Sequence, residues 1–134
     1  MLDRETSDTP QAGQNEHKGK TGLRRIWNAL FYSIDGLRAA LRHEDAFRQE
    51  VLLAAILIPV ALFTPAGGTG KALMVASVLL VLIVELLNSA VEATVDRVSL
   101  ENHILAKRAK DIGSAAVLLA LINVPVVWLL VLLG

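Results

Sequence analysis

The sequence contains no cysteine. This absence excludes a disulfide framework, a thiolate nucleophile and a metal site with cysteine ligands. The three histidines, His17, His43 and His103, lack the spacing of metal ligands, and we assign them to interface or loop positions. The N-terminus is polar and of mixed charge, so it does not resemble a cleavable signal peptide.

Charged residues are scarce in two parts of the chain, residues 51–91 and 112–134. Lysine plus arginine and aspartate plus glutamate balance at 13 each, so net charge identifies no partner and we expect no nucleic acid. Between the charged segments 1–50 and 92–111, only Lys71 and Glu85 are ionisable. A complete phosphate-binding loop is also absent. The segment GGTGK has Pro65 where GxxxxGK[ST] requires its first glycine, and Ala72 follows the lysine.

The chain does contain three long apolar segments, at about residues 46–65, 71–96 and 111–133. Because a helix rises 1.5 Å per residue, roughly 20 residues cross the ~30 Å hydrocarbon layer. Pro59 inside the first segment is tolerated in a spanning helix. The sequence therefore predicts an all-α membrane protein with three transmembrane helices.

The N-terminal part is polar and then amphipathic. Residues 1–21 show no apolar periodicity and are predicted to be a disordered tail, leaving 22–134 as a single membrane domain. From residue 22 to about 42, apolar side chains recur at steps of three and four. A soluble amphipathic helix is the alternative, but the apolar segments that follow favour a helix lying on the membrane surface.

Basic residues indicate the orientation. They gather before the first span and in the segment between the second and third spans, whereas the other connection has only Lys71 and residues 112–134 have none. Because short cytoplasmic loops are enriched in lysine and arginine, we expect the N-terminus and the second loop to be cytoplasmic.

A polar set lies at the predicted cytoplasmic end of the second span: Glu85, Asn88, Glu92 and Asp96. At about 100° per residue, Glu92 and Asp96 each lie about 20° from Glu85 on the helical wheel. A charge inside a spanning segment costs at least ~2.5–3.5 kcal/mol. Interhelical packing through Asn88 and Ser89 is the alternative explanation, but packing does not require two unpaired acids.

Carboxylates inside a spanning segment can serve in two chemical roles. One in apolar surroundings serves as a general base, and a pair can hold Mg²⁺ against nucleotide phosphates. The segments HEDAFRQE (43–50) and KRAKDIGSAA (107–116) add acidic and basic groups expected on the same side. These patterns support a cation-dependent reaction at the membrane surface without identifying it.

Four segments in this order, FYSIDGLRAA, HEDAFRQE, IVELLNSAVEATVDR and KRAKDIGSAAV, resemble the prokaryotic integral-membrane diacylglycerol kinases. The resemblance covers about residues 23–133. It implies a homotrimer in the bacterial inner (cytoplasmic) membrane, each chain having a surface helix and three spans. It also implies transfer of the γ-phosphoryl group of ATP to the primary hydroxyl of diacylglycerol, which gives phosphatidic acid.

The resemblance also implies residue roles. Glu85 would be the catalytic base, with Asn88 orienting the site, and Glu44 and Glu92 would hold Mg²⁺ and thereby contribute to ATP binding. The remaining expected ATP-binding residues are Arg25, Tyr32, Glu101, Asn102, His103, Lys110 and Asp111. The expected lipid-binding residues are Arg25, Phe47, Arg48, Gln49, Glu50, Glu85 and Ser114.

Three other functions compete with this one. A sister group of kinases phosphorylates undecaprenol, although the run SAVEATVDRVSLENH looks more like the diacylglycerol branch. An ion or proton relay would use Glu85 and Glu92, but it requires polar groups across the full membrane thickness. A purely structural subunit would leave the buried acids without a reason.

Overall fold

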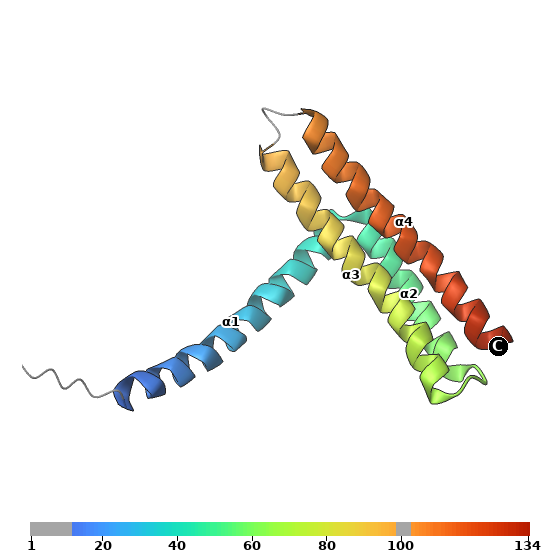
Figure 1. Cartoon of the computed structure of the whole chain (residues 1–134), viewed down its shortest axis with the longest axis horizontal. Coiled ribbons are helices and arrows are strands. Elements are labelled where there is room, and N and C mark those ends of the chain that lie inside the picture. Colours follow the sequence, from blue (N-terminus) through green and yellow to red (C-terminus); the bar gives the residue numbers. More distant parts are fainter. Residues whose placement is uncertain (1–11, 99–102) are drawn as a thin grey trace, which may run out of the picture. The chain divides into compact units, whose positions relative to one another are not determined.

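The computed structural model describes residues 12–98 and 103–134, and within these ranges it is entirely helical. The helices are α1 (Ala12–His43), α2 (Asp45–Phe63), α3 (Gly68–Val98) and α4 (His103–Leu133) (Figure 1). Of the predicted tail, residues 1–11 lie outside the described ranges. Helix α1 begins at Ala12, earlier than the start near residue 22 that apolar periodicity indicated.

The chain divides into two compact units between Arg38 and Ala39. Within the first unit, α1 exposes its large apolar side chains, and Trp27 packs edge-on against Phe31 with ring centroids 5.3 Å apart. The second unit holds the last turn of α1 together with α2, α3 and α4. The groups identified below as the site, from Glu44 onward, all belong to this second unit.

Three helices are long and apolar enough to cross a membrane: Asp45–Phe63, Gly68–Val98 and Ile104–Leu133. The prediction of an all-α chain with three candidate spans is therefore confirmed. The observed α4 begins at His103 rather than near residue 111, because the charged segment before the apolar run is helical as well. Pro59 and Pro125 lie inside α2 and α4. Each helix continues through its proline, as spanning helices tolerate.

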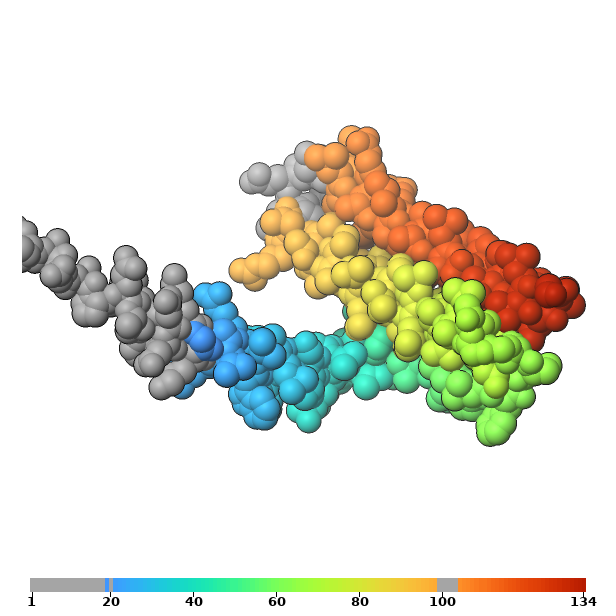
Figure 2. Space-filling view, turned by 60° about the horizontal axis from the view of Figure 1, so that its bottom comes forward, coloured from blue at the N-terminus to red at the C-terminus, as the bar shows by residue number. Residues whose placement is uncertain are grey.

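Helix α3 is the centre of the second unit. It contacts α4 most extensively and α2 next, and α3 and α4 lie side by side in both views (Figures 1 and 2). Its buried residues recur at steps of three and four and so form one face of the helix: Met74, Ser77, Val78, Val81 and Glu85. On α2 the buried residues include Ala54 and Ala61, whose small side chains permit close helix approach.

A shared hydrogen bond joins α3 to α4 near the N-terminal end of α3 and the C-terminal end of α4. The indole Nε1–H of Trp128 lies 3.2 Å from Ser77 Oγ and 3.3 Å from Met74 O, and donates to both. The Ser77 hydroxyl in turn donates to Met74 O at 2.7 Å. Since Ser77 and Met74 are both buried, these contacts satisfy polar groups that apolar surroundings would otherwise leave without partners.

We expect Trp128→Phe to destabilise the folded protein by about 0.6 kcal/mol, and by no more than ~1.7 kcal/mol, the range measured for interhelical hydrogen bonds in membranes. Phenylalanine keeps an aromatic ring but removes the N–H donor. Unfolding in mixed detergent micelles of rising SDS fraction measures the change. Trp27→Phe on α1 is the matched control, because no hydrogen bond of its indole links α3 to α4. Equal unfolding midpoints for both variants would contradict the assigned role.

Candidate active site

The site begins with Glu85, which continues the buried face of α3. Its side chain is 5% exposed, in line with Val78 and Val81 of the same face. The helical register that buries the apolar residues therefore also buries a carboxyl group. No ion pair to Glu85 is present among residues 12–98 and 103–134. A buried carboxyl without a cation costs folding free energy, and such groups mark functional sites.

Further carboxyl groups surround Glu85. Glu50 of α2 lies beside the Glu85 carboxyl, and Glu44 and Glu92 lie within electrostatic range of it. The Oε2 atom of Glu50 is buried and accepts no hydrogen bond within the described part of the chain. Four carboxyl groups from the α1–α2 connection, α2 and α3 therefore converge with no basic side chain paired to any of them in the described ranges. The cluster favours a ligand that brings positive charge.

Asn88 links two turns of α3 within this cluster. Its Nδ2 group donates to Glu92 Oε1 at 3.4 Å, a long hydrogen bond between residues four positions apart. Its Oδ1 atom is buried and accepts no hydrogen bond in the described ranges. An amide that is hydrogen-bonded to one carboxylate oxygen helps to orient that carboxylate.

Basic groups border the cluster on α4. Lys110 pairs with Asp96 of α3, with Nζ 2.6 Å from Oδ1, and it also lies within electrostatic range of Glu92. Lys107 pairs with Asp111 on the same helix at 2.6 Å. The expected ATP-binding residues Lys110 and Asp111 are thus both present at this end of the helix pair, each with a partner. Contact of Lys110 with a phosphate would require it to exchange or share Asp96.

The acidic groups fit the chemistry of Mg²⁺. No group of three or more His, Cys, Asp or Glu side chains within the described ranges is arranged to enclose a metal ion. Mg²⁺ does not need such an enclosure, because it takes one or two carboxylates and fills its other positions with water and phosphate oxygens. Glu44 begins α2 as its N-cap but makes no side-chain capping hydrogen bond, so its carboxylate remains available.

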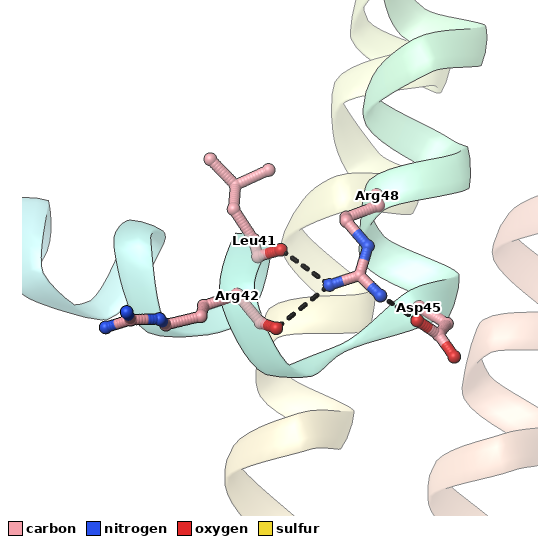
Figure 3. A network of polar contacts seen from close by, with 4 residues as sticks. All are labelled: Leu41, Arg42, Asp45 and Arg48. Atoms are coloured by element: carbon pink, nitrogen blue, oxygen red, sulfur yellow. Dashed lines mark hydrogen bonds and ion pairs between the residues drawn. The ribbon is translucent and has the colours of Figure 1, made fainter.

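Two residues expected to border a lipid, Phe47 and Arg48, also make contacts within the chain, and their role in lipid binding stays a prediction. Phe47 is 3% exposed and packs inside the second unit. Arg48 holds the connection between α1 and α2 (Figure 3): its Nη1 donates to Leu41 O at 2.8 Å and Arg42 O at 2.9 Å, and its Nη2 pairs with Asp45. The guanidinium thereby satisfies carbonyls that the end of α1 leaves without intrahelical partners. Gln49 and Ser114 are exposed and accessible.

The structure does not place several of the expected site residues relative to the cluster. Arg25 and Tyr32 are exposed on α1, in the unit that ends at Arg38. Glu101 and Asn102 lie outside the described residues, and His103 is described only as the first residue of α4. Their contribution to nucleotide binding stays a prediction.

Sequence reasoning missed Gly113. A Cβ atom built on this α4 residue would lie 2.1 Å from Asn88 Oδ1, so the Asn88 side chain of α3 packs directly against the backbone of α4 here. A glycine inside a predicted span signals close helix approach, but the sequence does not identify the residue that it faces.

The fold and this cluster define a class of protein: a helical membrane protein with three candidate spans and an acidic cluster around the buried Glu85, in which no carboxyl group forms an ion pair with a basic residue of the described ranges. A comparison with known families matches residues 31–132 to "Prokaryotic diacylglycerol kinase". The chain therefore belongs to the prokaryotic diacylglycerol kinase family, a family of enzymes.

Individual relatives agree with the family match. A diacylglycerol kinase of Pseudomonas aeruginosa is 60% identical over 117 residues, covering 87% of this chain and 95% of the relative. That of Haemophilus influenzae is 51% identical over 108 residues, covering 81% and 92%. That of Escherichia coli (strain K12) is 47% identical over 112 residues, covering 84% and 92%. The resemblance stated from four sequence segments is thus confirmed.

Proposed function

We propose that this chain is a lipid kinase that transfers the γ-phosphoryl group of ATP to the primary hydroxyl of diacylglycerol. Family membership supplies the class of reaction. The observation that supports the site is the buried Glu85 carboxyl, which lies beside Glu50 and near Glu44 and Glu92. None of these four carboxyl groups forms an ion pair with a basic residue in the described part of the chain. An acceptor hydroxyl needs a base, and nucleotide phosphates need cations beside them. The cluster suits both requirements.

In the proposed reaction Glu85 accepts the proton of the lipid hydroxyl as that oxygen attacks the γ-phosphorus of ATP. The new oxygen–phosphorus bond forms while the bond to the bridging oxygen of ADP breaks, and the products are phosphatidic acid and ADP. Phosphoryl transfer depends mainly on positioning and neutralisation of charge. Asn88 orients Glu92, and Lys110 is close enough to Glu92 to contribute positive charge at the phosphates.

Glu44 and Glu92 are the residues that would hold Mg²⁺, which supplies charge neutralisation at the ATP phosphates when bound. They suit this role because neither carboxylate forms an ion pair with another described residue and both lie near Glu85. Arg25 and Tyr32 of α1 and the segment 101–103 are proposed to complete the nucleotide site. Gln49, Glu50 and Ser114 are proposed to contact the lipid.

We place the enzyme in the bacterial inner membrane as a homotrimer, with its N-terminus and the α3–α4 connection in the cytoplasm. The distribution of basic residues supports this orientation. The exposed apolar side chains of α1 support a position at the membrane surface. ATP is available on that side, where the acidic cluster would open.

The test is phosphate transfer from radiolabelled ATP to diacylglycerol and to undecaprenol, assayed separately in detergent micelles with Mg²⁺. We expect labelled phosphatidic acid and little labelled undecaprenyl phosphate. Labelling of undecaprenol alone would keep the reaction class and overturn the acceptor. Labelling of neither lipid by protein shown to be folded would overturn the kinase function and favour a relay.

A further inference from the structure

Gly113 touches the one amide of the acidic cluster. A Cβ atom at residue 113 would lie 2.1 Å from Asn88 Oδ1 and 3.3 Å from Asn88 Cγ, and no heavy atoms other than those of Asn88 are among its nearest neighbours. At 2.1 Å the two atoms cannot coexist, so a side chain here forces Asn88 to move. The obstructing atom is the far end of a side chain that can rotate. Movement of Asn88 is therefore easier than separation of α3 from α4.

The position of Asn88 matters because its Nδ2 group contacts the Glu92 carboxylate. Nδ2 donates to Glu92 Oε1 at 3.4 Å, already near the limit of a hydrogen bond. The Oδ1 atom lies against the bare backbone of Gly113 and accepts no hydrogen bond in the described ranges. The close approach of Gly113 on one side and the hydrogen bond to Glu92 on the other therefore set which way the amide of Asn88 faces. Rotation of the amide would take Nδ2 away from Glu92.

We propose that Gly113 is a positioning residue, which seats the Asn88 amide so that it orients the Glu92 carboxylate for the cation that accompanies ATP. The inference rests on the proposed function, in which Glu92 contacts Mg²⁺. Groups that orient a metal-binding carboxylate change metal affinity about 10- to 100-fold when they are lost. Gly113 acts through Asn88 and does not touch the reacting atoms.

The same helix pair offers a matched control. At the opposite end, a Cβ atom on Gly70 of α3 would lie 2.7 Å from Val131 Cγ1 of α4. Gly70→Ala therefore also crowds the α3–α4 contact, and the obstructing atom again belongs to a side chain that can rotate. Gly113→Ala differs in its location beside Asn88 and Glu92. A general loss of helix packing would affect both variants.

The first measurement is binding of Mn²⁺, as a substitute for Mg²⁺, to the full-length protein with ADP, counted by electron paramagnetic resonance. We expect Gly113→Ala to bind Mn²⁺ about 10-fold more weakly than the parent protein. Gly70→Ala should bind like the parent. In an Asn88→Ala background, adding Gly113→Ala should change nothing further. Equal weakening by both alanine variants, or equal weakening with and without Asn88, would overturn the proposal.

A second measurement does not depend on nucleotide binding or on activity. In protein labelled with ¹⁵N-asparagine, the side-chain amide signal of Asn88 is assigned by its absence from Asn88→Ala. Gly113→Ala should shift this signal, and so should Glu92→Gln, while Gly70→Ala should not. An unshifted signal in Gly113→Ala overturns the inference even where the kinase assay succeeds. If the kinase assay fails, the same spectra still decide whether Gly113 positions Asn88.

Discussion

Glu85→Gln is expected to lower phosphatidic acid formation by about 100-fold or more, the lower end of what general bases contribute. Glutamine preserves the shape of the side chain but does not accept a proton at neutral pH. It can also donate a hydrogen bond to the Glu50 carboxyl that it meets on α2. The folded state should therefore survive, and steady-state transfer from radiolabelled ATP in micelles measures the loss.

Asp96→Asn is the matched control for this prediction. Asp96 lies on the same side of α3 as Glu85 but pairs with Lys110, so its charge is already neutralised. We expect much of the activity to remain in this variant. Unfolding in mixed micelles checks that Glu85→Gln is folded. Retention of parental turnover by folded Glu85→Gln would remove Glu85 from the role of base.

Glu92→Gln is expected to raise the Mg²⁺ concentration required for half-maximal activity by at least about 10-fold, because even an outer contact of a metal site has an effect of that size. The amide is a weaker cation ligand than the carboxylate. Apparent affinity for MgATP should fall with it, whereas the concentration dependence on diacylglycerol should change little. Activity measured over a Mg²⁺ series at fixed ATP provides the result.

Two further variants make this second prediction specific. Glu92→Asp keeps the charge and should recover part of the Mg²⁺ response at high Mg²⁺, whereas Glu92→Gln should not. Lys107→Gln removes a charge from the neighbouring helix, where Lys107 pairs with Asp111, and should leave the Mg²⁺ response unchanged. A parental Mg²⁺ dependence in Glu92→Gln would count against any metal contact by this residue.

The spans were predictable because each depends on local sequence alone. A long run that is mostly apolar predicts a helix of spanning length, and the three runs correspond to α2, α3 and α4. The ends of helices were less predictable. Helices α1 and α4 extend into polar segments at Ala12 and His103, where no apolar periodicity marks a boundary. Helical backbone does not require an apolar face, so the hydrophobic pattern indicates less helix than is present.

The candidate site was predictable only along one helix. Periodicity alone placed Glu85, Asn88 and Glu92 close together on α3, and the Asn88–Glu92 hydrogen bond agrees with that placement. The contact of Glu50 with Glu85 joins two helices, and its register depends on packing that no local pattern encodes. Gly113 was missed for the same reason, since its importance lies in the residue opposite.

Arg48, at the turn between α1 and α2, has a limited number of hydrogen-bond donors. A guanidinium carries five N–H groups, and Arg48 directs one each to Leu41 O, Arg42 O and Asp45. A lipid headgroup could therefore use only the remaining donors without opening the turn. Lysine carries its donors on a single nitrogen, which lacks the planar fork that reaches two carbonyls and a carboxylate together. A change of Arg48 to lysine would thus keep the positive charge but not all of the hydrogen bonds that hold the turn.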